Sequence, residues 1–404
     1  LDKNKKLIRT FGHVKKCKMN LDKKVYLDNA ATTPIRPEVK ETMIEALSYY
    51  GNPSSVHSFG RTAKSLIEKA RKNIAKELGV SSSEIIFTSG GTEAINMILK
   101  GAVRDLGITQ IVTSPTEHHA VLNTVHSIEN EYGIQVSYVK LDAKGTPDIE
   151  DLNKILSEFL SDEKVLVSLM YVNNEIGNLL SVAKVAEICQ KYKAYFHCDT
   201  VQAVGHYPID LSSLSIDFIS ASAHKFYGPK GVGFAFIRKD LPIKSFLFGG
   251  EQERGRRAGT ECLHNIVGME EAFLLAYQNL DKERTYIEGL KKYFIERISQ
   301  EIPLVRFNGQ SDNLTESAYT IVNVSLPIEP KKTDVVMLFL DMRGVACSRG
   351  SACQSGSVQS SHVLRAILPE EQWYEAHLRF SFSIFNTKEE IDYSIEVLKE
   401  FLQD

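Results

Sequence analysis

Two side chains able to do covalent chemistry stand in unusual surroundings in this sequence. Lys225 lies in AHKFYGPKGVG (223–233), a glycine-rich turn directly after an apolar run. A lysine at the mouth of a buried sheet is partly desolvated, which lowers the pKa of its amine and frees it for a Schiff base. Cys353 lies in CSRGSACQSGSVQSS (347–361), whose small and polar residues are typical of an exposed loop with a reactive thiol. A solvated surface lysine is the ordinary alternative for the first of these.

Other candidates could hold an anion. SGGTEA (89–94) follows an apolar run and opens a helical pattern. Adjacent glycines let backbone N–H groups converge, and a helix N-terminus adds its positive end, so Gly91 and Thr92 are candidates for binding a phosphate. A tightly packed N-cap with Thr92 as the capping residue explains the pattern equally well. Ser222 and His224, which flank the lysine turn, are further phosphate donors.

Charged and aromatic candidates follow other apolar runs. Asp199 ends AYFHCD, and a carboxylate there could hold a cationic ring nitrogen, although strand-end aspartates are usually caps. His118 or His119 could stack on a planar ring or move a proton, and Asn174 lies in a polar stretch that a turn also explains. Arg379, between Leu and Phe, is expected to meet an anion, because an unpaired buried arginine is costly.

The surrounding elements predict one α/β sheet that would collect these side chains. Apolar runs alternate with amphipathic stretches over residues 84–238, which indicates right-handed crossovers and a mostly parallel sheet. The predicted strands are 84–88, 109–114, 164–170, 194–199, 217–222 and 231–237. Ligands of such sheets bind at the carboxyl ends of the strands, where the candidates lie. The later chain, with a helical stretch at 268–300 and strand-like runs at 319–326 and 378–385, reads as an α+β part.

Composition excludes several classes. The 404 residues carry 48 Lys and Arg against 51 Asp and Glu, so overall charge does not favour nucleic acid. Six cysteines in a chain of this length do not suggest a disulfide scaffold, and neither C-x-x-C nor H-E-x-x-H occurs, so we expect no resident metal and a reducing compartment, the cytoplasm. No apolar run has membrane-spanning length. Residues 1–18 form a basic leader, either spurious sequence ahead of Met19 or a transit peptide.

Together, a phosphate cradle, a ring carboxylate, a Schiff-base lysine, a stacking histidine and a carboxylate-binding arginine are the parts that a pyridoxal phosphate site needs. On this combination the chain resembles the cysteine desulfurases of the nitrogen-fixation and housekeeping iron–sulfur class, which are fold-type I pyridoxal phosphate transferases of the class V aminotransferase family. The motifs that carry the resemblance are YLDNAATTP (26–34), GNPSS (51–55), FTSGGTEA (87–94), TEHHAV (116–121), VNNEIG (172–177), HCDTVQA (197–203), SAHKFYGPKG (222–231), GGEQERGRRAGT (249–260), SRGSACQSG (348–356) and LRFS (378–381).

The resemblance implies a division of roles and of the chain. Lys225 binds pyridoxal 5'-phosphate as a Schiff base, and Cys353 is the nucleophile. The other implied assignments are Asp199 at the ring nitrogen, His118 stacked on the ring as an acid or base, Gln202 at the phenolic oxygen, Gly91, Thr92, Ser222 and His224 at the phosphate, Thr260 at the phosphate of the partner subunit in a homodimer, and Asn174 and Arg379 at the substrate carboxylate, with Asn174 also beside the cofactor. The large domain would span 35–278, and the small α+β domain would combine 19–34 with 279–404.

The implied reaction converts L-cysteine into L-alanine and leaves a persulfide on Cys353. The sulfur would pass to an iron–sulfur scaffold protein or a tRNA-thiolation protein, and Cys353 would at most briefly share a scaffold's iron–sulfur cluster. The chain departs from many relatives at Arg349 and Ala223, which leaves the choice of partner open. A selenocysteine or cystine lyase on the same scaffold, and a catalytically silent scaffold for iron–sulfur assembly, are the alternatives; the Cys353 loop and the complete residue set argue against them. No nucleic acid or membrane partner is expected.

Overall fold

A computed structural model describes residues 23–160, 162–329, 332–349 and 361–403. Its centre is a seven-stranded sheet with the strand order β2-β8-β7-β6-β5-β3-β4. The strands are β2 (Ile85–Thr88), β3 (Gln110–Thr113), β4 (Gln135–Tyr138), β5 (Val165–Met170), β6 (Tyr195–Asp199), β7 (Phe218–Ser222) and β8 (Gly233–Ile237). The predicted α/β class and the six predicted strands are therefore confirmed, while β4 was not predicted.

All pairings in this sheet are parallel except the two made by β8, which runs antiparallel to β2 and to β7. Apart from edge strand β4, the strands are almost wholly buried, because helices cover both faces. β8 starts at Gly233, where a Cβ would lie 2.8 Å from the Cα of Gly90 and 2.2 Å from the carbonyl oxygen of Ala221. The missing side chain of Gly233 thus lets the turn at Gly90 approach the sheet closely.

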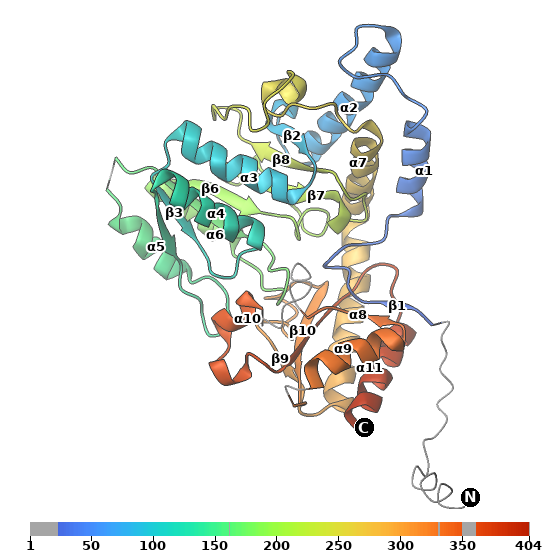
Figure 1. Cartoon of the computed structure of the whole chain (residues 1–404). Helices are drawn as coiled ribbons and strands as arrows, with labels where there is room; N and C mark the ends of the chain where they lie inside the picture. Colours follow the sequence, from blue (N-terminus) through green and yellow to red (C-terminus); the bar gives the residue numbers. More distant parts are fainter. Residues whose placement is uncertain (1–22, 161, 330–331, 350–360, 404) are drawn as a thin grey trace, which may run out of the picture.

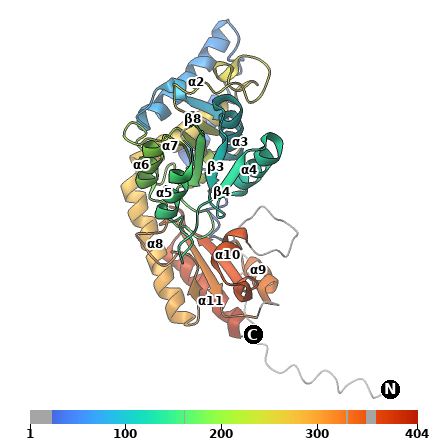
Figure 2. The ribbon, with the colours of Figure 1, turned by 90° about the vertical axis from the view of Figure 1, so that its left-hand side faces the viewer.

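The helices form a layer on each face of the sheet (Figures 1 and 2). One face is covered by α3 (Gly91–Gly101) and α4 (His119–Tyr132), which share an apolar cluster with the sheet. The other face packs against α2 (Ser58–Glu77), α5 (Ile149–Glu158), α6 (Val182–Tyr192) and α7 (Leu263–Gln278). The expected helix over 268–300 is two helices, α7 and α8 (Leu280–Glu301), and α1 (Pro37–Ala46) packs on α7.

The remaining elements lie at one end of this layered unit, joined to it by α8 (Figure 2). They are β1 (Val25–Tyr26), β9 (Arg306–Phe307), β10 (Ile321–Leu326), α9 (Thr333–Met342), β11 (Val345–Ala346), α10 (His362–Ile367), β12 (Ala376–Ser381) and α11 (Lys388–Gln403). The strands form an antiparallel sheet, β12-β10-β9, and a parallel pair, β1-β11. The N-terminal strand therefore joins the C-terminal part, whereas the domain boundaries near residues 34 and 278 stay predictions.

The elements are joined by short turns of helix at Ser82–Glu84, Ala102–Leu106, Ala223–Lys225, Gln252–Gly255 and Glu370–Gln372. Over the described ranges, none of the helices is both long enough and apolar enough to span a bilayer.

Candidate active site

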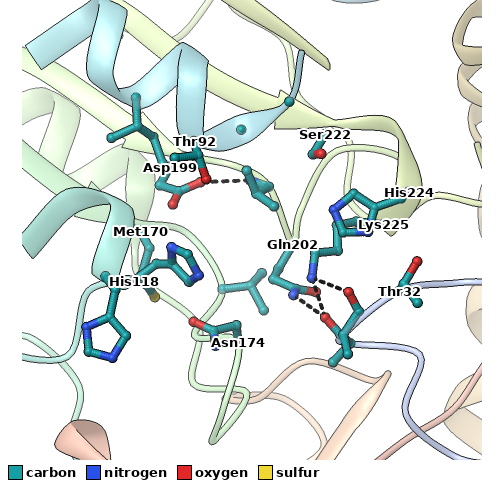
Figure 3. Close-up of a pocket in the computed structure, with 18 of the residues that line it drawn as sticks. Thr32, Thr92, His118, Met170, Asn174, Asp199, Gln202, Ser222, His224 and Lys225 are labelled. Atoms are coloured by element: carbon teal, nitrogen blue, oxygen red, sulfur yellow. Dashed lines mark hydrogen bonds between the residues drawn. The ribbon is translucent and has the colours of Figure 1, made fainter. Parts of the chain in front are cut away.

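A cavity of about 580 Å³ opens where the carboxyl ends of β5, β6 and β7 meet the N-terminus of α3 (Figure 3). Its walls come from the large sheet, from the segment after β1 and from β12. The predicted site residues that line it are Gly91, Thr92, His118, Asn174, Asp199, Gln202, Ser222, His224, Lys225 and Arg379. Side chains from distant parts of the sequence therefore share one cavity, as the strand-end rule predicts.

Lys225 ends the helical turn Ala223–Lys225 that follows β7, and its amine points into the cavity (Figure 3). The Nζ atom donates hydrogen bonds to the carbonyl oxygens of Ala30, at 2.6 Å, and Ala31, at 2.8 Å. His206 fixes the backbone of the turn through Nε2, which lies 2.9 Å from the carbonyl oxygen of Lys225. The amine is thus held by neutral acceptors of the N-terminal segment, beside the space that a cofactor aldehyde would need.

Asp199 ends β6 and is buried at the floor of the cavity. Its Oδ1 atom accepts hydrogen bonds from the Val201 amide and the Ser220 hydroxyl, each at 3.0 Å. Burial raises the pKa of Asp199, against the opposing effect of these hydrogen bonds and of the Lys225 charge. A buried carboxylate that is costly to ionise gains most from a cationic partner, so a protonated ring nitrogen fits this position.

The end of the cavity nearest α3 suits a phosphate. α3 begins at Gly91, and the first amides of a helix have no partner within it. The Nδ1 atom of His224 is buried and has no hydrogen-bond partner among the described residues. Burial and the charges of Lys225 and Lys230 lower the pKa of His224 to about 4, so its neutral ring can offer Nδ1–H to an anionic oxygen. These donors fit the phosphate group of pyridoxal phosphate.

His118 is the N-cap of α4, and its Nδ1 atom accepts a hydrogen bond of 3.0 Å from the amide of Ala120. Burial, followed by the positive charge of Lys225, lowers the pKa of His118 to about 4, so the ring is neutral near pH 7. With Nδ1 acting as the acceptor, the proton of the neutral ring is on Nε2. His118 is therefore set up as a hydrogen-bond donor toward the cavity.

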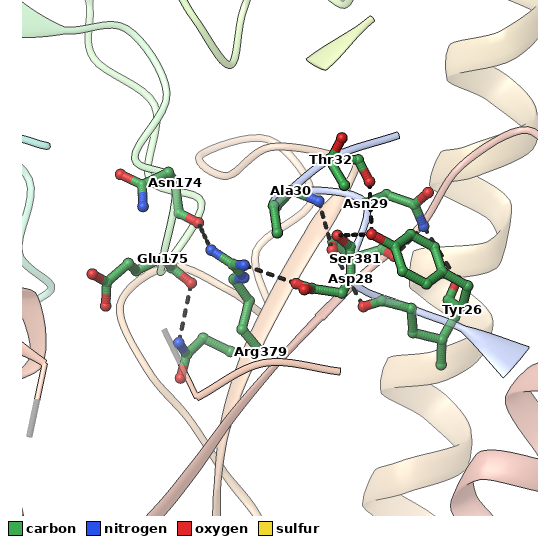
Figure 4. Close-up of polar contacts among 12 residues, drawn as sticks. Tyr26, Asp28, Asn29, Ala30, Thr32, Asn174, Glu175, Arg379 and Ser381 are labelled. Atoms are coloured by element: carbon green, nitrogen blue, oxygen red, sulfur yellow. Dashed lines mark hydrogen bonds and ion pairs between the residues drawn. The ribbon is translucent and has the colours of Figure 1, made fainter. Parts of the chain in front are cut away.

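Arg379 lies on β12 and lines the cavity from the C-terminal part of the chain; Figure 4 shows its polar contacts. Its Nη1 atom donates to the carbonyl oxygen of Asn174 at 2.6 Å, and its Nη2 atom pairs with Oδ1 of Asp28 at 2.9 Å. The anion that Arg379 was expected to contact is the carboxylate of Asp28 in the same chain.

Two predicted site residues stand apart from this cavity. Thr260 is exposed and does not line it, which leaves its assignment to a partner subunit untested. Cys353 lies outside the described residues. Of the two departures, Arg349 forms an ion pair with Asp334, and Ala223 is the buried first residue of the lysine turn.

Sequence reasoning missed several groups of the site. The Ala30 and Ala31 carbonyls and the Asp28 carboxylate belong to YLDNAATTP (26–34), a motif that supported the resemblance without any assigned role. Gln202 also contacts this segment, through Nε2 and the Ala30 carbonyl oxygen at 2.9 Å.

A buried acid next to His118 was also missed. The Oε1 atom of Glu117 accepts from Ser114 at 2.9 Å, whereas Oε2 has no partner among the described residues. Burial raises the pKa of Glu117 to about 8, and the charge of Asp199 adds to the effect. Glu117 therefore carries a proton near pH 7.

Comparison with known proteins identifies the family of the chain. Residues 25–393 match the aminotransferase class-V family. The cysteine desulfurase IscS of Dictyoglomus turgidum is 42% identical over 386 residues, which cover 95% of each chain. Among solved structures, a NifS-like protein superposes with a TM-score of 0.85 at 36% identity over 94% of this chain and 100% of its own. A structure described as SspA in complex with cysteine superposes with a TM-score of 0.75 at 30% identity, covering 90% and 100%.

The chain therefore belongs to the aminotransferase class-V family, whose members compared here are pyridoxal phosphate enzymes with this α/β fold. Within that family, its full-length likeness groups it with the cysteine desulfurases, as the sequence motifs indicate.

Proposed function

We propose that this chain uses pyridoxal phosphate to remove sulfur from L-cysteine, with the reactive groups divided between Lys225, Asp199, Arg379 and Cys353. The activity itself agrees with the desulfurases that match nearly the whole chain. The observation that carries the division of roles is geometric. A lysine amine, a buried carboxylate and a buried arginine converge on one cavity of about 580 Å³, with a helix N-terminus between them.

When bound, pyridoxal phosphate supplies an aldehyde for an amine and a cationic ring that withdraws electrons from the substrate Cα. Lys225 would attach it, and Asp199 would pair with its protonated ring nitrogen. Gly91 and Thr92 at the start of α3, together with Ser222 and His224, bind the phosphate. Gln202 lies beside the lysine turn, where it can contact the phenolic oxygen.

The protein groups then act on the substrate. Arg379 and Asn174 hold its carboxylate, and the Cys353 thiolate attacks its sulfur. The bond between sulfur and carbon breaks, a sulfur–sulfur bond forms on Cys353, and the carbon takes up a proton to become the methyl group of alanine. The Nε2–H of His118 faces the cavity and is the group suited to donate a hydrogen bond or a proton there.

We further propose a cytoplasmic homodimer that passes sulfur to an iron–sulfur scaffold or a tRNA-thiolation protein, with Thr260 donated to the partner's phosphate site. Exposed apolar side chains support an interface of this kind. They include residues at the end of α1, between α1 and the start of α2, and in the segment after β8, and they are Ile44, Leu47, Tyr50, Val56, Phe59 and Phe248. Residues 35–278 would form the large domain, with 19–34 and 279–404 forming the small one.

The function is tested by mixing the purified protein with L-cysteine and a reductant and measuring alanine and sulfide together. We expect equal amounts of the two products from the wild type. Cys353→Ser should bind the cofactor and cysteine but make almost no alanine. Cys262→Ser, which removes an exposed thiol, should behave as the wild type does. Normal alanine formation by Cys353→Ser would instead favour a lyase that needs no persulfide.

A further inference from the structure

The arginine assigned to the substrate carboxylate already has an anionic partner in the structure. Arg379 is only 2% exposed, and its two terminal nitrogens contact Asn174 and Asp28 (Figure 4). Its third nitrogen, Nε, is buried and has no partner among the described residues. The guanidinium has N–H donors to spare, but a substrate carboxylate that binds it shares the cation with the Asp28 carboxylate already paired there.

The two partners of Arg379 are not equally easy to replace. Asn174 offers a neutral backbone carbonyl, and the loop after it is fixed by hydrogen bonds from the amides of Glu175 and Ile176 to Oδ1 of Asn173. Asp28 offers a carboxylate, the same chemical group as the ligand, and 19% of its side chain is exposed. A carboxylate that can reach water is hydrated again when it leaves the arginine, and its side chain can rotate, whereas the Asn174 carbonyl belongs to a fixed backbone.

The backbone around Asp28 is held in place independently of the ion pair. Asp28 forms an isolated parallel β-bridge with Ser381. The Oγ atom of Ser381 accepts a hydrogen bond of 2.8 Å from the Ala30 amide, and its carbonyl oxygen accepts one of 2.7 Å from the Asn29 side chain. Tyr26 donates to the Thr32 carbonyl oxygen at 2.9 Å across the same segment. Exchange at Arg379 therefore needs only a rotation of the Asp28 side chain.

We propose that Asp28 is a place-holding carboxylate, which neutralises Arg379 until the carboxylate of the amino acid substrate displaces it. This rests on the proposed function, because it takes Arg379 as the carboxylate site. Every carboxylate ligand then binds in competition with Asp28. The competition weakens binding of amino acids but leaves ligands without a carboxylate unaffected, so Asp28 is a positioning residue that sets the substrate affinity.

The proposal predicts an affinity change in a direction opposite to that of ordinary structural damage. In the holoenzyme of Asp28→Asn, we expect L-alanine to bind about tenfold more tightly than in the wild type, measured by calorimetry and by the cofactor absorbance. Asparagine keeps an oxygen for Arg379 but loses the competing charge. Cysteamine, which is cysteine without its carboxylate, should bind equally to both proteins. Weaker or unchanged alanine binding by Asp28→Asn would overturn the proposal.

Three further variants separate the possible failures. Glu283→Gln removes the carboxylate from the Arg36–Glu283 ion pair, which joins α8 to the N-terminal segment outside the cavity, and should leave alanine affinity unchanged. Arg379→Gln should lose alanine binding; if it does not, the carboxylate site of the proposed function is wrong. If Arg379→Gln loses binding while Asp28→Asn gains none, only the place-holder is wrong. Asp28→Ala, checked for folding by its melting temperature, should repeat the gain.

Discussion

Glu117, which is fully buried, and its chain neighbour His118, which lines the cavity, are neutral near pH 7 for the same physical reason. Burial is the largest cause for both, and it raises the pKa of Glu117 to about 8 and lowers that of His118 to about 4. These two neighbours therefore add no charge of their own near Asp199, whereas the positive charge of Lys225 does act on it. Negative charge near the ring nitrogen is concentrated on the one acid that a cationic ring can pair with.

The raised pKa of Glu117 has a consequence for stability. Between its ordinary value of 4.5 and about 8, the folded chain binds a proton that the unfolded chain releases. The stability that this proton confers is complete below pH 4.5 and is lost as the pH rises through 8. We predict that Glu117→Gln, which cannot ionise, gains stability relative to the wild type by up to about 1.4 kcal/mol per pH unit from pH 5 to 8.

Urea unfolding of both proteins at several pH values measures this difference. His118 contributes a slope of the opposite sign at lower pH, but it is present in both proteins and cancels in the comparison. A difference in free energy of unfolding that is independent of pH would show that Glu117 is ionised in the folded state.

At the residue scale, the sequence was informative about side-chain types but not about their partners. The positions of Asp199, Ser222 and Lys225 at or just after strand ends predicted that they would lie close together, and all three line one cavity. The contact between Arg379 and Asp28 joins residues 351 positions apart, and neither local pattern nor spacing indicates it. Such pairs depend on how the small sheets pack, which is a property of the tertiary structure.

At the element scale, the start of α3 depends on the absence of a side chain. A Cβ on Gly91 would lie 2.6 Å from Cγ2 of Val201, another residue of the cavity wall. We predict that Gly91→Ala pushes these groups apart and weakens pyridoxal phosphate binding about tenfold. The double variant Gly91→Ala/Val201→Ala should recover most of the affinity, because it removes the clash.

The measurement is a titration of the apoenzyme with the cofactor, followed by absorbance. Val201→Ala alone serves as the matched control. Equal loss of affinity in the single Gly91→Ala and the double variant would mean that the helix start tolerates the methyl group and that the loss has another origin.

Element types were easier to predict than element limits and directions. Continuous apolar runs identified β5, β6 and β7 to within a residue of their limits. The break between α7 and α8 was missed because Asn279 interrupts the helix without proline or glycine. The antiparallel direction of β8 was also not predicted, since apolar content carries no information about strand direction.

At the scale of the whole molecule, the proposed homodimer makes a prediction about shared sites. If Thr260 serves the partner's cofactor, a heterodimer of Lys225→Ala and Thr260→Ala chains retains one intact site, built from the lysine of one chain and the threonine of the other. We expect this heterodimer to bind one pyridoxal phosphate with wild-type affinity.

The control places both substitutions, Lys225→Ala and Thr260→Ala, in the same chain. A heterodimer of the double variant Lys225→Ala/Thr260→Ala with the wild type has one lysine, and that site faces the altered threonine, so its cofactor should bind more weakly. Two tags allow each heterodimer to be purified, and absorbance titration compares them. Equal affinities would place Thr260 outside the partner's site.

The pairing of β1 with β11 sets the order in which the molecule can be completed. Val25 lies beside Val345, so the strand made first needs a neighbour that is synthesised some 320 residues later. At ribosomal speed this is a delay on the order of half a minute. The Ala30 and Ala31 carbonyls that receive the lysine amine belong to the same segment, so the earliest part of the chain closes the catalytic chamber last. A nascent chain stalled before residue 345 would hold a formed central sheet and an unfinished site.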